Sequence, residues 1–221
     1  MNTKRKYKIN DEFFNSFSKE NAYILGYILT DGNISKRNGE VKIGSVDKEI
    51  LEKIAQKLEN TYPIKGYLPK NRTKIQYTLY LSSRKIYNKL IQLGLKPNKS
   101  KIVRMLKIPK KYFFHFLRGV IDGDGSVYTQ QDKYKNKTYT FLRVSIVSAS
   151  IPFLKSLQKE INELSGLRLK NLTKNRTAFL VKYSTKESLK LLKLVYKDSI
   201  NLRLERKYNK YMEYLGLSLD K

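Results

Sequence analysis

In the first half of the chain, segments whose apolar residues are spaced as in a helix are followed by segments whose apolar residues are spaced as in a β-strand. An apolar run follows Ser18, a residue type that caps helices, and it ends at Asp31-Gly32. A turn sequence at Asn38-Gly39 then separates two short strand-like segments, which is typical of a β-hairpin. The order αββαββα is therefore predicted. The expected elements are helix 19–31, strands 33–37 and 40–46, helix 48–59 with Asp47 as its cap, strands 62–68 and 74–81, and helix 83–93.

The second half repeats this order of elements with a longer first hairpin. Tyr80-Leu-Ser-Ser-Arg84 resembles Lys182-Tyr-Ser-Thr-Lys186, and Ser45 matches Ser148 at nearly the same spacing. We expect an α+β protein made of two pseudo-symmetric αββαββα halves. The expected elements are a helix from Pro109 to 124, strands 127–134 and 139–148, helix 150–164, strands 167–174 and 177–184, and helix 186–196. The predicted organisation is a basic N-terminal arm (1–17), a first half (18–94), a linker (95–109) and a second half (110–221).

Both halves contain a helix that ends in small residues followed by Asp-Gly. Glycine costs a helix roughly 1 kcal/mol, so its repeated use there needs a physical reason. Residues four positions apart share a helix face, where small side chains let another backbone come close. The matched small residues are Gly26 and Thr30 in the first copy, and Gly119 and Gly123 in the second. They predict a close seam between the two helices.

An aspartate closes each of these helices, Asp31 in the first and Asp124 in the second. A carboxylate at the C-terminal end opposes the helix dipole, which is already negative there. Holding a cation explains this placement better than stability does. The alternative is that each Asp-Gly merely ends a helix in a turn, and the matched pair argues against it.

The charge of the chain narrows the choice of partner. With 46 Lys and Arg against 19 Asp and Glu, the 221 residues carry a formal net charge of +27. Such an excess favours a polyanion such as nucleic acid, with an anionic membrane surface as the weaker alternative. The absence of cysteine excludes disulfides and thiolate metal sites. No signal peptide or membrane-spanning run is evident, so a soluble intracellular protein is expected.

The two Asp-Gly segments resemble the nine-residue signature of LAGLIDADG homing endonucleases in the single-chain form with two copies. Residues 117–125 fit the signature well and keep both of its acidic positions, as Asp122 and Asp124. Residues 24–32 depart from it at the first acidic position, where Leu29 stands. The resemblance implies a monomer whose motif helices pack at the centre. Each half would supply a four-stranded antiparallel sheet to a saddle that binds double-stranded DNA.

The resemblance also implies roles for individual residues. Asp31 and Asp124 would be catalytic and bind metal, together with the backbone at Gly32 and Gly125. Residues two apart on a helix point about 200° away from each other, so Asp122 is assigned to the surface or the seam. The single histidine, His115, is interpreted as structural. Further roles implied by the family are catalytic lysines at Lys99 and Lys207, and water-positioning side chains at Ser45 and Ser148.

The expected cofactor is Mg²⁺, because few carboxylates and no sulfur ligands suit a hydrated hard cation. Mn²⁺ is expected to substitute, and Ca²⁺ to bind without supporting cleavage. The resemblance implies a long asymmetric target, cut across the minor groove to leave short 3′ overhangs. The residues expected to contact DNA are Arg37, Lys42, Lys65, Tyr67, Lys74, Gln76, Tyr80, Tyr128, Gln130, Tyr139, Arg143, Arg168, Lys170, Arg176 and Lys182. Two alternatives remain open, a maturase that binds intron RNA and a DNA-binding regulator without catalysis.

Overall fold

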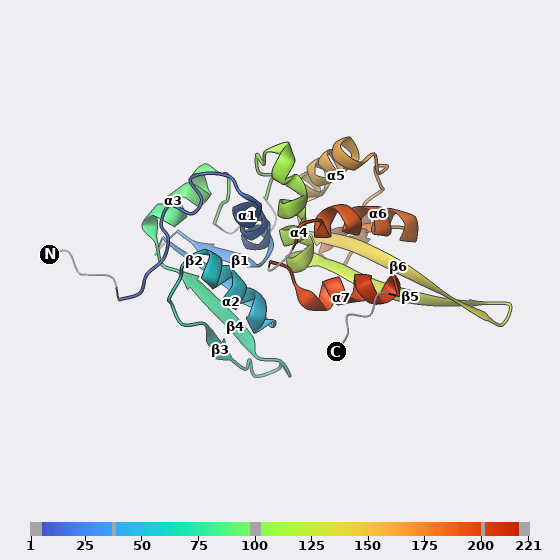
Figure 1. Ribbon diagram of the computed structural model, residues 1–221, viewed down its shortest axis with the longest axis horizontal. Coiled ribbons are helices and arrows are strands. Elements are labelled where there is room, and N and C mark those ends of the chain that lie inside the picture. Colours follow the sequence, from blue (N-terminus) through green and yellow to red (C-terminus); the bar gives the residue numbers. More distant parts are fainter. Residues whose placement is uncertain (1–5, 37–38, 98–102, 200–201, 217–221) are drawn as a thin grey trace.

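The computed structural model describes residues 6–36, 39–97, 103–199 and 202–216. Its two halves lie side by side and contain the same order of elements (Figure 1). The first half consists of α1 (Lys19–Asp31), β1 (Gly32–Ser35), β2 (Glu40–Ser45), α2 (Lys48–Lys57), β3 (Lys65–Tyr67), β4 (Gln76–Leu81) and α3 (Arg84–Gln92). The second half consists of η2 (Lys110–Tyr112), α4 (Phe113–Asp124), β5 (Gly125–Tyr134), β6 (Lys137–Ser148), α5 (Ile151–Ser165), β7 (Thr173–Asn175), β8 (Ala178–Tyr183), α6 (Thr185–Tyr196) and α7 (Glu205–Tyr214).

Each half forms one four-stranded antiparallel sheet, with strand orders β1-β2-β4-β3 and β5-β6-β8-β7. The predicted α+β fold and its internal repeat are therefore confirmed. Even the register repeats, because Gly32 pairs with Ile43 as Gly125 pairs with Ile146. The repeat places Ser45 and Ser148 at equivalent ends of β2 and β6.

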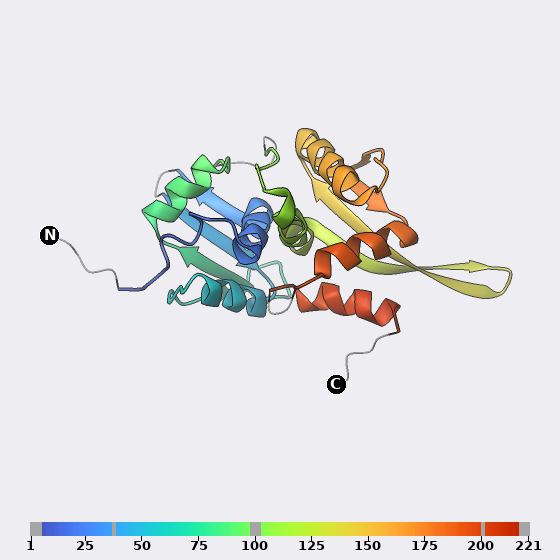
Figure 2. The same cartoon turned by 45° about the horizontal axis from the view of Figure 1, so that its top comes forward.

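Helices cover one face of each sheet (Figure 2). Along β2, Val41 and Ile43 are buried while Lys42 and Gly44 are half-buried. Since side chains alternate between the faces of a strand, this pattern separates an apolar face from a basic one. The basic face is thus free of the hydrophobic core.

Helices α1 and α4 cross at the centre of the molecule, where glycine permits close contact (Figure 2). A Cβ atom at Gly26 would overlap the carbonyl oxygen of Phe116, and one at Gly119 would overlap that of Tyr23. Both helices are buried at this level, so no side chain could turn away into solvent. The two glycines set the distance between the two halves.

Two predicted strands are shorter than expected because side-chain amides take their backbone hydrogen bonds. The predicted strand 167–174 begins only at Thr173, since Gln158 bonds both the N–H and the carbonyl of Lys170. The predicted strand 62–68 is reduced to β3, and Asn60 accepts the N–H of Tyr62. A side chain that satisfies the backbone removes the need for a strand partner.

Helix α7 is a further difference, because the sequence pattern did not predict it. It runs along β5 of its own half, and its first turn lies at the boundary with the first half (Figure 1). Two ion pairs hold it there, Lys53 to Glu205 and Arg206 to Asp47. In the part of the chain that the structure describes, no helix is long and apolar enough to cross a membrane.

Candidate functional site

Both motif helices end in the same way, with an aspartate as the last helical residue and a glycine that opens the next strand. The N–H of Gly32 donates to the carbonyl of Ile28, and that of Gly125 to the carbonyl of Ile121. A Cβ atom on Gly125 would lie 2.7 Å from the Cα of Ile121. The glycines are therefore needed for the chain to leave the helix directly into β1 and β5.

The two Asp-Gly ends meet at the same end of the helix pair. Thr30 packs against Gly123, and the Oδ2 atom of Asp31 lies 3.2 Å from where a Cβ on Gly123 would be. Since Gly123 directly precedes Asp124, the carboxylate of one motif lies against the backbone of the other. Asp31 is half-buried and Asp124 is exposed, so solvent and ligands can approach the pair.

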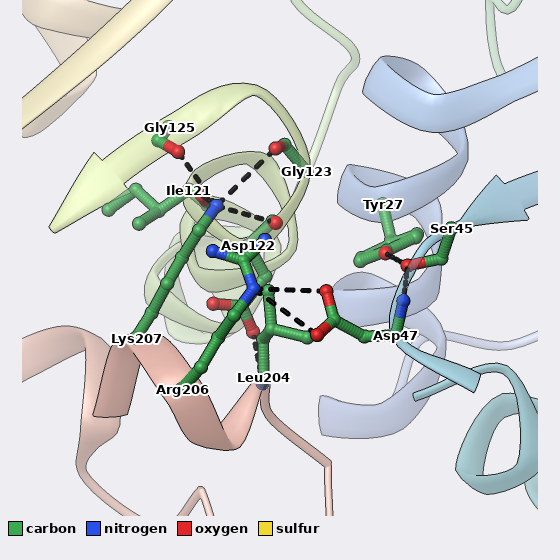
Figure 3. A network of polar contacts seen from close by, with 10 residues as sticks. All are labelled: Tyr27, Ser45, Asp47, Ile121, Asp122, Gly123, Gly125, Leu204, Arg206 and Lys207. Carbon is green, nitrogen blue, oxygen red and sulfur yellow. Dashed lines mark hydrogen bonds and ion pairs between the residues drawn. The ribbon is translucent and has the colours of Figure 1, made fainter. Parts of the chain in front are cut away.

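Lys207 fills the space behind the second Asp-Gly end (Figure 3). Its buried Nζ donates to the carbonyl oxygens of Ile121, Asp122 and Gly125, each at 2.7 Å, and approaches Gly123 at 3.4 Å. An ammonium has three protons, so the three short contacts use all of them. Burial lowers the pKa of Lys207 to about 8, an effect that Asp122 opposes. The lysine neutralises the negative end of α4.

Asp122 faces the interior rather than the surface. Its Oδ2 accepts hydrogen bonds from the hydroxyl of Tyr23 at 2.8 Å and from the N–H of Leu204 at 2.9 Å. Its Oδ1 has no hydrogen-bond partner among the described residues. Burial raises the pKa of the Asp122 carboxyl to about 6, although Lys207 acts in the opposite direction. Because Tyr23 belongs to α1, Asp122 lies in the seam.

These contacts join α4 and α7 reciprocally. Leu204 precedes α7 and cannot cap it with its own side chain, so the Asp122 carboxylate accepts the N–H at that end. In return, Lys207 from the first turn of α7 caps the C-terminal end of α4. The carboxylate thus lies at the positive N-terminal end of the α7 dipole, and the ammonium lies at the negative C-terminal end of the α4 dipole. Leu29 occupies the matching position in α1, and Lys99 lies outside the described residues.

The two predicted water-positioning serines both serve the turns that follow their strands. Ser45 accepts a hydrogen bond from the N–H of Asp47 at 3.1 Å and another from the hydroxyl of Tyr27. Ser148 accepts from the N–H of Ser150 at 3.1 Å. Their equivalent positions thus have equivalent backbone contacts.

A pocket of about 430 Å³ lies beside the second Asp-Gly end. It is lined by Gly123, Gly125, Ser126, Val127, Tyr128, Ser145, Arg206 and Lys207. The charges of Arg206, Asp31 and Asp124 all act on the pKa of Lys207, so these groups share one electrostatic neighbourhood. The two basic residues of α7 thus line this pocket, and the carboxylates of Asp31 and Asp124 are close enough to act on Lys207.

The open faces of both sheets present tyrosines flanked by cations. The Lys42 and Lys65 ammonium groups lie 5.0 and 5.4 Å from the ring centroid of Tyr80. In the second sheet, the Lys182 ammonium lies 5.7 Å from the ring of Tyr128, opposite Arg143 in the register. Rings and cations on a surface of excess positive charge suit phosphates and base edges.

The remaining residues predicted to contact DNA have diverse positions. Tyr67 and Tyr139 are exposed, Gln76 is half-buried, and Gln130 donates to Asp132. Lys170 contacts the helices of its own half, since its backbone bonds the Gln158 side chain of α5. Its ammonium pairs with Glu187 at 2.5 Å on the side covered by α5 and α6. Exposed positions outside the long strands are Lys74, Arg168 and Arg176, and Arg37 lies outside the described residues.

Sequence reasoning missed three polar residues of this region. Arg118 is buried and donates to the carbonyls of Val195 and Leu202 and to Nδ1 of His115, which gives this histidine a structural role. Asp47 and Arg206 form an ion pair between the halves. A charged residue inside an apolar helix was the available signal for Arg118. The pair of Asp47 and Arg206 left no local signal.

The residues at the helix ends fit a hard cation that keeps most of its water. Among the described residues there is no cluster of three or more His, Cys, Asp or Glu side chains that could hold a metal. Two carboxylates from different helices and nearby carbonyls offer oxygen ligands only, a set that suits Mg²⁺ completed by water and phosphate. The Gly125 carbonyl already accepts a hydrogen bond from Lys207, so the carboxylates are the better ligands.

Comparison with known proteins identifies the type of domain and the fold. Residues 18–93 match the family described as LAGLIDADG-like domain. The replication factor C small subunit of Methanocaldococcus jannaschii is 23% identical over 215 residues, which cover 90% of this chain. The chain spans only about 10% of the length of that relative.

Three solved structures share the fold at low sequence identity. The I-SmaMI meganuclease bound to uncleaveable DNA has a TM-score of 0.60 at 12% identity, with 90% of each chain covered. The I-LtrWI LAGLIDADG homing endonuclease bound to target DNA has a TM-score of 0.58 at 13% identity, with 94% of this chain and 91% of the other covered. Full-length DUF199/WhiA from Thermatoga maritima has a TM-score of 0.55 at 15% identity, and 93% of this chain matches 65% of it.

Proposed function

We propose that this chain, which has a LAGLIDADG-like domain at residues 18–93 and the two-motif LAGLIDADG fold over most of its length, is a double-strand DNA endonuclease. It would bind a long duplex along its two open sheet faces. Because the two faces carry different side chains, the target would be asymmetric. Hydrolysis would use a divalent cation, with Mg²⁺ as the preferred ion.

The observation that carries this proposal is the meeting of the two Asp-Gly ends. Asp31 reaches the backbone at Gly123, so the carboxylates of both motifs lie beside the boundary between the sheets. A duplex that spans both sheets would pass over this point with one strand near each carboxylate. The chain has 46 basic and 19 acidic residues, and this excess of positive charge attracts the phosphates of the duplex.

The residues of the chain divide the work in this proposal. Asp31 and Asp124 would hold the metal and thereby orient water toward a phosphate. A bound Mg²⁺ would supply charge neutralisation and activate the attacking water. Lys207 has all three protons on carbonyl oxygens, so its role would be to position the end of α4 and with it Asp124. Basic residues of the sheets, Lys42, Arg143 and Lys182 among them, would meet phosphates and bases.

Selection from a randomised duplex library tests this function. The parent chain is incubated with the library in Mg²⁺ and, separately, in Ca²⁺, and the cleaved molecules are sequenced. Recovery of one long asymmetric sequence, cut only in Mg²⁺, is the expected result. Binding without cutting in both ions would contradict the proposal and favour the regulator or, if intron RNA competes better than DNA, the maturase.

Isosteric variants then test whether the carboxylates of Asp31 and Asp124 are catalytic. Asp31→Asn and Asp124→Asn keep the size of the side chain and remove its charge, so each should slow double-strand cleavage by at least about 100-fold, a loss typical of a catalytic group. Affinity for the recovered duplex in Ca²⁺ should fall far less. Glu52→Gln on the exposed face of α2 is the matched control, because it removes one charge away from the site. Full cleavage by either aspartate variant would contradict the assignment.

A further inference from the structure

The ion pair of Arg206 and Asp47 lies at the mouth of the candidate site and joins the two halves. Arg206 belongs to the first turn of α7 and lines the pocket beside Gly123 and Gly125, whereas Asp47 precedes α2 in the other half. Figure 3 shows Nε of Arg206 directed at the Asp47 carboxylate, while the terminal nitrogens of the guanidinium lie on the side of Lys207. Arg206 is therefore a cation of the pocket that is held by a carboxylate outside it.

Arg206 uses only part of its hydrogen-bonding capacity in this pair. Within the described residues, both contacts with Asp47 are made by Nε, at 3.0 Å to Oδ2 and 3.3 Å to Oδ1. A guanidinium has five N–H groups in a fork that matches phosphate oxygens. Its side chain is 55% exposed, so an incoming ligand can reach the remaining groups.

Asp47 gives up a local hydrogen bond to make this contact. It stands at the N-cap of α2, where an aspartate normally accepts an N–H of its own helix, yet its side chain makes no capping bond. Its structural equivalent Ser150 does cap α5, by accepting the N–H of Phe153. Asp47 thus has a second position available, as the cap of α2, whenever Arg206 leaves it.

We propose that Arg206 is a phosphate-binding residue of the site at Asp124, and that Asp47 occupies its guanidinium until DNA arrives. The Asp47 carboxylate takes the place of a phosphate in the DNA-free chain. A scissile or neighbouring phosphate would displace it and bind the guanidinium, and Asp47 would turn back to cap α2. The pair is partly exposed, and such pairs contribute little to stability, so the exchange is not costly. This inference rests on the proposed function.

Five variants separate a phosphate-binding role from a purely structural bridge. Arg206→Ala removes the phosphate ligand, Asp47→Ala removes only its partner, and the double variant removes both. Lys210→Ala is the matched control, because Lys210 is an exposed cation one turn further along α7 that pairs with Glu213. Arg206→Lys keeps the positive charge but removes the paired N–H groups of the guanidinium. Thermal melting of each variant verifies that it is folded.

Cleavage of the selected duplex, labelled at both 5′ ends, is measured in Mg²⁺ under single-turnover conditions. Arg206→Ala should slow the cleavage of one strand at least tenfold, so that nicked product accumulates. Asp124→Asn should slow the cleavage of the same strand by a larger factor. Asp47→Ala should cleave at least as fast as the parent, and Arg206→Lys should recover only part of the rate. If Asp47→Ala loses as much as Arg206→Ala, the pair is a structural bridge and the proposal is wrong. Parental rates in Arg206→Ala would also overturn it.

A binding measurement keeps this inference testable apart from catalysis. Anisotropy of a 40-base-pair mixed-sequence duplex in Ca²⁺ is followed against salt concentration for the same variants. Loss of one phosphate contact in Arg206→Ala should reduce the slope of log affinity against log salt by about 1. An unchanged slope would contradict the inference even if the chain cuts no DNA, whereas a reduced slope without any cleavage would contradict only the proposed nuclease activity.

Discussion

The ends of α1 and α4 are alike in their catalytic candidates and different in what supports them. Both finish in Asp-Gly, and both approach the other helix through glycine. Behind the end of α4, however, Asp122 accepts the N–H of Leu204 before α7, and Lys207 of α7 binds the carbonyls of α4, while Leu29 stands at the position of α1 that matches Asp122. The hairpins differ as well, since β5 has 10 residues and β1 has 4. The glycine contacts and the Asp-Gly ends are thus alike in the two halves, whereas the support behind each end and the length of the hairpin differ.

The glycine seam is the shared feature whose loss should cost most. Valine at Gly119 would force its side chain into the carbonyl oxygen of Tyr23, and valine at Gly26 into that of Phe116. Neither helix can retreat from the other without opening the core, so each change should destabilise the fold by about 3 kcal/mol or more. Urea denaturation of both variants is the measurement. A large difference between them would contradict the symmetry of the seam.

Substitutions at Asp122 and at its counterpart Leu29 test whether the two helix ends differ in how they are supported. Asp122→Leu, which copies the first half, would leave the Leu204 N–H and the Tyr23 hydroxyl without their acceptor, at a cost of about 2–4 kcal/mol. Leu29→Met keeps volume and polarity in the first half and should cost less than about 1.5 kcal/mol. Equal losses in chemical denaturation would show that α7 is not anchored by Asp122.

The buried Asp122 also predicts a pH dependence that belongs to the second half alone. Its pKa in the folded protein is about 6, above the ordinary value of 3.8 in the unfolded chain. The folded state therefore binds the proton more tightly, and the contribution of Asp122 to stability falls as pH rises from about 4 to about 6. The change amounts to about 3 kcal/mol for a shift of this size.

Asp122→Asn isolates that effect from the other carboxyl groups. Asparagine retains an acceptor for Leu204 but does not ionise, so the stability of the parent relative to the variant should decrease across this pH range. Isothermal urea titrations at several pH values measure the difference. A constant difference from pH 4 to pH 6 would mean that Asp122 does not titrate there.

The unequal hairpins predict an unequal footprint on DNA, which is the smallest of these effects. Residues 131–140 are all exposed and form the projecting arm in Figure 1, with lysines at 133, 135 and 137. Gln130 pairs with Phe141, so the two can be joined by Asn-Gly in place of 131–140. This change removes four residues from each strand of the hairpin. At about 3.3 Å per residue, the lost length corresponds to roughly four base pairs of DNA.

The shortened chain should lose protection of about four base pairs at one flank only, and up to about tenfold in affinity as phosphate contacts disappear. Hydroxyl-radical footprinting in Ca²⁺ measures this on the duplex recovered by selection. Protection at the flank bound by the first half is the internal control. Loss at both flanks would indicate a folding defect, and loss at neither would show that the arm does not contact DNA.

The sequence predicts what is local or repeated. The strand order of each half follows from alternation and turn residues, and the close seam follows from Gly26 and Gly119. The α7 helix could not be predicted, because Glu205–Tyr214 is mostly polar and is held by partners far away in the sequence, Lys53 and Asp47 among them. Tertiary contacts rather than helical propensity decide such a segment.

The candidate site was predictable only in part for the same reason. A carboxylate at the end of each helix marks Asp31 and Asp124, and helix geometry predicts that Asp122 points away from Asp124, to the surface or to the seam. Which group Asp122 meets depends on where α7 arrives, which no local pattern gives. Lys207 was singled out by resemblance, but its contacts with carbonyl oxygens depend on burial. Asp47 illustrates the limit, since its position indicates a cap and its side chain binds Arg206 instead.

The reciprocal contacts of α4 and α7 have a consequence for synthesis on the ribosome. A chain emerges from its N-terminus at roughly 5–20 residues per second, so both motif helices exist before Leu204 and Lys207 are made. During that interval the carbonyls at the end of α4 lack Lys207, and Asp122 lacks the N–H that it accepts in the finished fold. The support of the acidic centre is therefore completed only after residues 204–207 have been made, and a nascent chain stalled before residue 204 would hold both aspartates without the contacts that fix the second.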